Sequence, residues 1–367
     1  MVKIVTNGLL YTGEEVLTHH AVVIQKDQII DIIPEYEIPA NAELIDCKGS
    51  FIVPGFIDLQ IYGAGGYLFS GNLTAEALKA IADDLVKKGT TGFVITLATN
   101  SIDVFLEAIR LVRDNPHPAL LGIHLEGPYI NPAKRGAHIE QYIKVPQRKE
   151  IEALLKEAAG VLKIMTLAPE VTDPVLIKLL IDNGVIVSAG HSIATFQQAT
   201  DGFAQGISCT THLFNAMSPF HHRDTGLPGA TFQSKTVMAS MVADGIHIDY
   251  QALMISKKLL QERMFLITDA VEECHEGPYQ HMKQGDHFTM PDGTLSGSAL
   301  TLLKAVENCV NHADIPLDEA LRMASTYPAQ ILNKTDVGKI KIGYKADLVV
   351  FNSEYQVEKV WLNGLIQ

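Results

Sequence analysis

The chain has 367 residues, of which 47% are hydrophobic and 19% are charged. A hydrophobic share of this size is typical of a folded globular protein and excludes a chain that is disordered throughout. Its 42 acidic residues outnumber its 29 basic ones, and the net charge of −13 argues against nucleic acid or an anionic membrane surface as the main partner.

The first fifty residues have the pattern of short β-strands separated by turns. We expect strands over 2–10, 21–25, 29–33 and 43–46. The intervals between these strands are too short for a crossover helix, so the pattern predicts a small antiparallel sheet.

From residue 55 onward, strand and helix patterns alternate. The expected strands are 55–61, 91–99, 119–126, 162–167, 185–190, 207–212, 237–245 and 264–268. The expected helices between them are 74–88, 102–113, 150–159, 174–183, 193–204 and 250–260. Sustained alternation indicates parallel βαβ units in an α/β fold. Eight strands without a GxGxxG motif favour a closed (β/α)₈ barrel of the TIM type over a doubly wound sheet.

The alternation stops after Asp269. A hairpin over 287–290 and 294–295, turning at Pro291-Asp292-Gly293, precedes two closing helices at 299–311 and 317–323. Strand patterns return at 346–351 and 357–362. We expect the two chain ends to meet in one small β-sandwich domain. The predicted division is therefore 1–53 and 339–367 for the small domain and 54–338 for the barrel.

Residues that can bind a metal ion stand at the ends of several predicted strands. Glu126, His191 and His212 end three of the strands, and Asp269 follows the eighth. Because the carboxyl ends of barrel strands surround the active site, these side chains should converge. One carboxylate and two imidazoles leave coordination positions open, which is typical of a catalytic divalent site.

A single histidine at a strand end is more often a hydrogen-bonded structural residue than a ligand. For His124, both a role behind the metal ligands and plain packing remain open. Most of the histidines in loops and helices are expected at the solvated surface. These are His117, His221, His222, His275, His281, His287 and His312.

An ordered set of motifs resembles one enzyme family. The motifs are HLEGPY (124–129), AGHS (189–192), THLFNAM (211–217), DGIH (244–247), TDA (268–270) and DGTLSGS (292–298). Together they resemble the N-acetylglucosamine-6-phosphate deacetylases of the amidohydrolase superfamily over essentially the whole chain. PGFID (54–58) and GYKADLVVF (343–351) are similar to segments found across that superfamily.

The resemblance implies roles for individual residues. Glu126, His191 and His212 match the metal ligands, and Asp269 matches the catalytic aspartate. Gly136, Ala137 and His138 resemble the segment that contacts the sugar and the amide carbonyl. The positions that match those holding the amino-sugar phosphate are Asn215, Ala216, Arg223, His247, Leu295, Ser296 and Gly297.

One departure from the wider superfamily concerns the number of metal ions. Many amidohydrolases have an HxH pair after the first barrel strand and bind a second metal there. This chain has Gln60 and Tyr62 instead. We therefore expect one divalent metal per chain. Zn²⁺ is the expected ion, and Fe²⁺, Co²⁺ and Mn²⁺ remain open because a Glu/His/His set accepts all of them.

The predicted chemistry assigns a task to each polar group. Asp269 would accept a proton from the attacking water and return it to the amine leaving group. His138 is expected at the amide carbonyl as a further catalytic residue, and His247 at a sugar hydroxyl. Since the protein as a whole is acidic, phosphate recognition must be local, and the guanidinium of Arg223 is suited to it.

The resemblance thus predicts an enzyme of amino-sugar catabolism that converts N-acetyl-D-glucosamine 6-phosphate to D-glucosamine 6-phosphate and acetate. Alternatives are the galacto epimer as substrate, hydrolysis of a cyclic amide, and a barrel that has lost catalysis. The family also implies a homodimer or a higher homo-oligomer, in which a neighbouring chain can reach the phosphate. Isolated cysteines, with no signal peptide or membrane-spanning segment, predict a cytoplasmic protein without a membrane partner.

Overall fold

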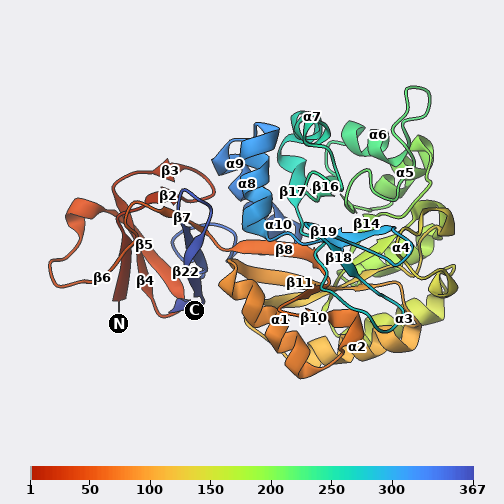
Figure 1. Ribbon diagram of the computed structural model, residues 1–367, viewed down its shortest axis with the longest axis horizontal. Coiled ribbons are helices and arrows are strands. Elements are labelled where there is room, and N and C mark those ends of the chain that lie inside the picture. The colour runs from red at the N-terminus through yellow and green to blue at the C-terminus, as the bar shows by residue number, and fades with distance from the viewer. Residues whose placement is uncertain (1) are drawn as a thin grey trace.

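The computed structural model describes residues 2–367 as a small β-rich domain joined to a larger α/β barrel (Figure 1). Both chain ends lie near each other in the small domain, where the N-terminal strands are red and the C-terminal strands dark blue (Figure 1). The small domain is therefore built from the two ends of the chain, as the sequence predicts.

Two sheets make up the small domain. A four-stranded sheet has the order β5-β4-β1-β6, and a six-stranded sheet has the order β23-β22-β21-β7-β2-β3. The strands are β1 (Val2–Thr6), β2 (Leu9–Tyr11), β3 (Val16–Leu17), β4 (His20–Gln25), β5 (Gln28–Pro34), β6 (Glu43–Asp46), β7 (Phe51–Pro54), β21 (Leu348–Phe351), β22 (Val357–Leu362) and β23 (Leu365–Ile366).

The two sheets share one apolar core. Val5 and Ile24 of the first sheet pack in the same cluster as Leu348 and Trp361 of the second. The expectation of an entirely antiparallel sheet is wrong, because β1 pairs with β6, and β2 with β7, in parallel. In both cases the chain passes through other strands before it returns beside the first one. The later strand can therefore run in the same direction as the first.

Eight parallel strands form the barrel, in the order β17-β16-β15-β14-β13-β12-β11-β8. Their bounds are β8 (Phe56–Ile61), β11 (Thr90–Ala98), β12 (Leu120–Glu126), β13 (Leu162–Leu167), β14 (Ile186–Ala189), β15 (Cys209–Thr210), β16 (Met238–Met241) and β17 (Met264–Leu266). A bridge between Ile61 and Ala270 joins the first strand to the last, and Asp269 N–H donates to Gln60 O at 3.0 Å. These contacts close the barrel and confirm the predicted fold.

Helices surround the barrel (Figure 1). They are α1 (Ala75–Lys87), α2 (Ile102–Asp114), α3 (Arg148–Ala158), α4 (Pro174–Asp182), α5 (Phe196–Ala204), α6 (Gly226–Gln233), α7 (Tyr250–Leu260), α8 (Leu302–Ala313), α9 (Leu317–Ala324) and α10 (Thr326–Ile331). Two helices, α6 and α10, lie outside the predicted ranges. Helix α6 contains two glycines and a proline and is mostly buried, so it lacks the polar face by which a helix is read from sequence.

Short strands and turns lie in the loops between the barrel elements. The predicted hairpin is present as β19 (His287–Thr289) and β20 (Leu295–Ser298), and β18 (Met282–Gln284) adds a third strand. Strands β9 (Gly63–Ala64) and β10 (Tyr67–Leu68) pair beside β8. The 3₁₀ turns are Glu35–Glu37, Phe69–Gly71, Pro132–Lys134, Glu140–Tyr142, Pro169–Val171 and Gln261–Arg263. None of the helices within residues 2–367 has the length and apolar character needed to cross a bilayer.

Candidate active site

Four strand-end residues meet at the mouth of the barrel. Glu126 is the last residue of β12, while His191, His212 and Asp269 follow β14, β15 and β17. Their exposed fractions are 2%, 5%, 5% and 8%, respectively. Because parallel strands end at the same edge, residues far apart in sequence become neighbours there.

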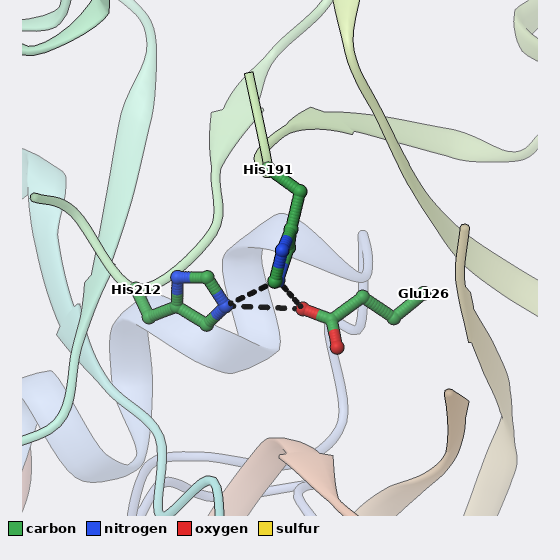
Figure 2. A group of neighbouring side chains, drawn as sticks. All are labelled: Glu126, His191 and His212. Carbon is green, nitrogen blue, oxygen red and sulfur yellow. Dashed lines mark hydrogen bonds and ion pairs between the residues drawn. The ribbon is translucent and has the colours of Figure 1, made fainter. Parts of the chain in front are cut away.

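Glu126, His191 and His212 direct one ligand atom each toward a common point (Figure 2). Glu126 Oε1 lies 3.3 Å from His191 Nε2 and 3.1 Å from His212 Nε2. The two imidazole nitrogens are 3.2 Å apart. Tetrahedral ligands at ordinary zinc distances are separated from one another by roughly 3.4 Å. The three spacings therefore fit a single divalent ion.

The hydrogen bonds of His191 support the same interpretation. Its Nδ1 lies 2.8 Å from the carbonyl oxygen of Lys134, which can only accept, so Nδ1 carries the proton. In the neutral ring, Nε2 then presents a lone pair toward Glu126 and His212. A lone pair aimed at a carboxylate oxygen and a second imidazole nitrogen suits a cation bound among them. The residues present fit a bound divalent metal.

The pKa shifts of the cluster show which charges its residues stabilise on one another. Burial raises the pKa of the Glu126 carboxyl, but the neighbouring His191 and His138 outweigh it and hold this pKa well below its usual range. Burial also opposes the charged form of His212, yet the hydrogen bond to Glu126 raises the pKa of His212 to about 9. By contrast, burial lowers the pKa of His191. A positive charge is thus stabilised at the point where the three residues meet.

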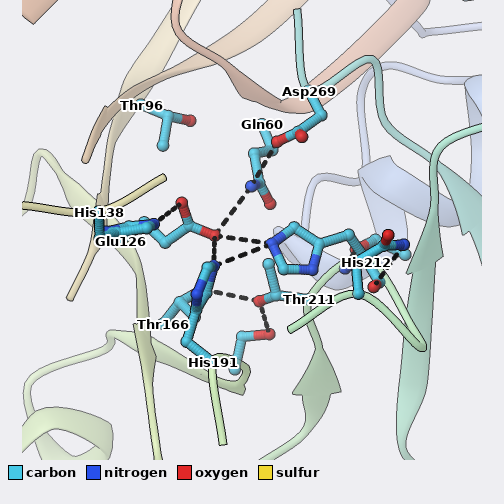
Figure 3. A network of polar contacts seen from close by, with 12 residues as sticks. Gln60, Thr96, Glu126, His138, Thr166, His191, Thr211, His212 and Asp269 are labelled. Carbon is cyan, nitrogen blue, oxygen red and sulfur yellow. Dashed lines mark hydrogen bonds and ion pairs between the residues drawn. The ribbon is translucent and has the colours of Figure 1, made fainter. Parts of the chain in front are cut away.

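Gln60 and Tyr62 occupy the position of the missing HxH pair. The Gln60 amide nitrogen donates to Glu126 Oε1 at 3.1 Å and to Asp269 Oδ1 at 2.9 Å (Figure 3). The Tyr62 hydroxyl donates to Glu126 Oε2. Both side chains direct hydrogens at the carboxylates, where imidazoles would direct lone pairs at a metal ion. From sequence, only the absence of the histidines could be noted.

A second group of side chains surrounds Asp269. The Asp244 carboxylate lies 2.6 Å from His247 Nδ1, and the other nitrogen of that ring, Nε2, lies 3.6 Å from Asp269 Oδ2. The ring of His247 is therefore oriented by one aspartate toward the other. Burial raises the pKa of Asp269, although His212 and His247 act in the opposite direction.

His138 contacts the metal-ligand cluster directly. Its Nε2 lies 3.0 Å from Glu126 Oε2, and its Nδ1 lies 2.7 Å from Thr99 Oγ1. The carboxylate can only accept, so Nε2 carries a proton that points into the site. Figure 3 shows His138 on the opposite side of Glu126 from His212.

His124 makes no hydrogen bond to Glu126 among residues 2–367; its Nδ1 lies 3.2 Å from the carbonyl oxygen of Leu59. Its Nε2 is 2.8 Å from Thr166 Oγ1, and Thr166 in turn is 2.7 Å from Thr211 Oγ1. Burial lowers the pKa of His124 to about 4, so its ring is neutral. His124 therefore belongs to a buried hydrogen-bonded layer behind the ligands.

A cavity of about 860 Å³, part of it open to solvent, lies above these residues. Nearly all the sequence-predicted site residues line its wall. They are Glu126, Gly136, Ala137, His138, His191, His212, Asn215, Ala216, His247, Asp269, Leu295, Ser296 and Gly297. The tertiary structure thus brings the strand ends, the loop after β12 and the β20 segment to one place.

Arg223 is the exception. It is exposed and is not part of the cavity wall, and among residues 2–367 no lysine or arginine lines this cavity. The loop that carries it, between β15 and α6, instead presents Phe220 with 54% of its surface exposed.

Sequence reasoning missed several wall residues. Tyr279 and His281 line the cavity and are only 4% exposed, so the expected surface position of His281 is wrong. Both come from the irregular segment between β17 and β18. Its sequence has no strand or helix period from which their placement could be read.

Comparisons with known proteins identify the chain. Residues 51–366 match the model of the amidohydrolase family, and residues 4–52 match that of the NagA composite domain. The chain is 33% identical to N-acetylglucosamine-6-phosphate deacetylase of Haemophilus influenzae over 98% of this chain and 97% of that protein. It is 32% identical to N-acetylgalactosamine-6-phosphate deacetylase of a Shewanella species, over 85% and 82% of the two chains.

A solved structure has the same fold throughout. The crystal structure of N-acetylglucosamine-6-phosphate deacetylase from Pasteurella multocida superposes with a TM-score of 0.97 at 32% identity, covering 100% of both chains. The chain therefore belongs to the amidohydrolase family, in the group that contains the N-acetylglucosamine-6-phosphate deacetylases.

Proposed function

We propose that the protein hydrolyses the acetamide of N-acetyl-D-glucosamine 6-phosphate, giving D-glucosamine 6-phosphate and acetate in amino-sugar catabolism. The observation that carries this proposal is the convergence of Glu126, His191 and His212 on one point, with Asp269 beside them, in one cavity. The names of the similar proteins supply the substrate class.

Glu126, His191 and His212 would hold the divalent ion. Such an ion lowers the pKa of water and polarises an amide carbonyl. Asp269 is placed to accept a proton from the attacking water and to return it to the amine nitrogen as the C–N bond breaks. Its buried position favours the protonated form needed for the second step.

Two histidines would orient the substrate. The Nε2–H of His138 donates to Glu126 Oε2, and the side chain lines the cavity, so it would also donate a hydrogen bond to the amide carbonyl oxygen as negative charge develops there. His247, held by Asp244, presents its other nitrogen beside Asp269 and suits a sugar hydroxyl. Backbone and small side chains complete the sugar pocket. These are Gly136, Ala137, Asn215, Ala216, Leu295, Ser296 and Gly297.

We further propose one metal ion per chain, with Zn²⁺ as the ion. The Gln60 amide hydrogens lie between Glu126 and Asp269 and repel a second cation. The Glu/His/His donor set suits zinc and also accepts Fe²⁺, Co²⁺ or Mn²⁺.

We assign phosphate binding to Arg223 of a second copy of the chain. In a homodimer, this arginine would reach the phosphate bound in the neighbouring site. The cavity wall described above lacks a cationic side chain, while Arg223 stands on an exposed loop. Phe220 on that loop and Ile193 beside it are exposed to 54% and 45%, which suits a surface covered by a partner.

The remaining assignments concern the whole protein. The four cysteines form no disulfide within residues 2–367, which supports a cytoplasmic location. The proposed domain limits are 1–53, 54–338 and 339–367. The first limit falls one residue before the end of β7 at Pro54, and barrel strand β8 begins at Phe56.

Metal analysis combined with an acetate-release assay tests the function. We expect one metal per chain and faster hydrolysis of the gluco epimer than of N-acetylgalactosamine 6-phosphate. A preference for the galacto epimer would instead support the activity named for the Shewanella relative. Absence of hydrolysis of either sugar by the metal-loaded protein would reject the proposal.

A further inference from the structure

Residues 274–281, in the second half of the segment between β17 and β18, form a strap over one side of the cavity. Its two ends are joined by backbone hydrogen bonds between Cys274 and His281, at 3.0 and 2.9 Å. Near the second of these ends, the Tyr279 hydroxyl donates to the carbonyl oxygen of Thr99 at 2.6 Å. Because Thr99 directly follows β11, the strap is fixed to the barrel itself.

This strap holds His281 against the cavity. One ring nitrogen, Nδ1, lies 2.9 Å from Ser296 Oγ, and the ring stacks on Tyr279 with 6.3 Å between centroids. Within residues 2–367, no hydrogen bond is made by the other nitrogen, Nε2. The side chain is 4% exposed and lines the same cavity as the metal-ligand cluster.

The environment of His281 also fixes its charge. Burial lowers the pKa of His281 to about 4, and no acidic side chain is hydrogen-bonded to it among residues 2–367. The ring is therefore neutral at physiological pH. A neutral imidazole offers one donor and one acceptor, and Ser296, whose hydroxyl can play either part, allows both tautomers.

We propose that His281 is a specificity-determining residue that binds a ring hydroxyl of the sugar through Nε2. The inference rests on the proposed function and adds to it a contact outside the predicted set of site residues. A hydroxyl donates and accepts, so it matches a neutral imidazole in either tautomer. The phosphate, by contrast, requires a cationic partner that this residue does not supply.

The test measures kcat/KM for N-acetylglucosamine 6-phosphate and for its 1-deoxy, 3-deoxy and 4-deoxy analogues. We expect His281→Ala to lower kcat/KM for the parent sugar by about 10- to 100-fold, because a buried sugar hydroxyl loses its partner. For the analogue that lacks the contacted hydroxyl, variant and wild type should agree within about 2-fold. His281→Gln, which keeps a hydrogen-bonding group, should recover part of the loss.

His275→Ala is the matched control, since His275 lies in the same segment with its side chain 70% exposed. It should leave all four values unchanged. An equal loss for His281→Ala on every sugar, or no loss, overturns the inference. Should His281→Ala fail to fold, His281→Phe replaces it in the same comparison, because this variant keeps an aromatic ring for packing and removes the hydrogen bond. If the wild type hydrolyses none of the four sugars, the proposed function fails, and this inference fails with it.

Discussion

At the scale of single residues, the site is built on unusual backbone conformations. His191, His212 and Asp269 have φ values of 48°, 33° and 55°, in the left-handed region that residues with a side chain rarely adopt. Such conformations cost about 1 kcal/mol or more each and persist where the surrounding structure fixes them. Here they turn each side chain inward directly after its strand. The side chains that follow three separate strands therefore converge on one place.

Asp269 is expected to carry the proton transfers. Replacement of its carboxylate, Asp269→Asn, should lower kcat by about 10²- to 10⁴-fold, because the amide cannot accept a proton. The metal content should stay the same, since the three ligand residues are intact. Acetate release and metal analysis on the same samples check both statements. Asp201→Asn, on the outside of α5, is the control, and a loss below 10-fold for Asp269→Asn would contradict the assignment.

Gln60 and Tyr62 are expected to restrict the site to one metal. In the double variant Gln60→His with Tyr62→His, two imidazoles replace two hydrogen donors. Such a protein should bind about two zinc ions per chain, whereas the wild type should bind one. Elemental analysis after dialysis against zinc distinguishes them. Two ions in the wild type would show that Gln60 does not exclude the second metal.

At the scale of elements, the loop that carries His191 is fastened by Glu170. This carboxylate, in the 3₁₀ turn after β13, accepts from Ser192 Oγ at 2.6 Å, from Ile193 N–H at 2.7 Å and from Asn131 Nδ2 at 3.0 Å. The loops after β12, β13 and β14 are thereby tied together. His191, with its strained backbone, depends on such support if it is to hold a metal ion.

Glu170→Gln should therefore weaken metal binding. The amide offers donors where three donors already point, so the His191 loop loses part of its anchorage. We expect the dissociation constant of the metal to rise by about 10- to 100-fold, as measured by competition with a chelator. Glu43→Gln, on the exposed strand β6, is the control. Unchanged metal affinity would mean that Glu170 has no part in positioning His191.

The loop between β15 and α6 is expected to act on the neighbouring chain. Arg223→Ala should raise KM for the phosphorylated sugar by about 10- to 100-fold and leave KM for free N-acetylglucosamine nearly unchanged, because only the phosphate contact is lost. Lys235→Ala, another exposed cation, is the control. Equal effects on both substrates would remove Arg223 from this role.

Mixed dimers can then show which chain supplies the arginine. Subunits with Arg223→Ala, mixed with Asp269→Asn subunits, should regain activity, since one site of each hybrid has both groups intact. If no activity is regained, Arg223 serves its own chain.

At the scale of the whole molecule, one buried carboxylate ties together the first and last barrel strands. Asp58 on β8 accepts from Thr268 Oγ1 at 2.5 Å and from Gln60 N–H at 3.1 Å, and Thr268 directly precedes Asp269. Burial raises the pKa of Asp58 to about 7. Because the folded state holds the proton more tightly than the unfolded state, this group stabilises the fold at low pH and loses that contribution as the pH rises toward 7.

Asp58→Asn should remove this dependence while keeping the hydrogen bonds of the protonated acid. Between pH 5 and pH 8, the wild type should lose roughly 2.5 kcal/mol of unfolding free energy relative to the variant. Urea unfolding at both pH values measures the difference. Parallel stability curves for the two proteins would show that Asp58 is already ionised in the folded state.

Much of this architecture could be read from the sequence. The positions of the eight barrel strands, and the convergence of Glu126, His191 and His212, depend on local alternation and on which residues end each strand. These features depend on short stretches of sequence. Closure of the barrel brings the strand ends together independently of the conformation of the loops. The origin of the small domain from both ends followed from the same local patterns.

Other features were decided only by the tertiary structure. The burial of His281 and the position of Arg223 outside the cavity involve segments with no strand or helix period. The hydrogen bonds of Gln60 join a residue of strand β8 to carboxylates that lie 66 and 209 positions away along the chain. The strap over the cavity is held by a bond from Tyr279 to Thr99, 180 positions apart in the chain. Contacts over such distances depend on how the whole barrel packs, so the sequence determined the chemistry at the strand ends and the folded chain determined what surrounds it.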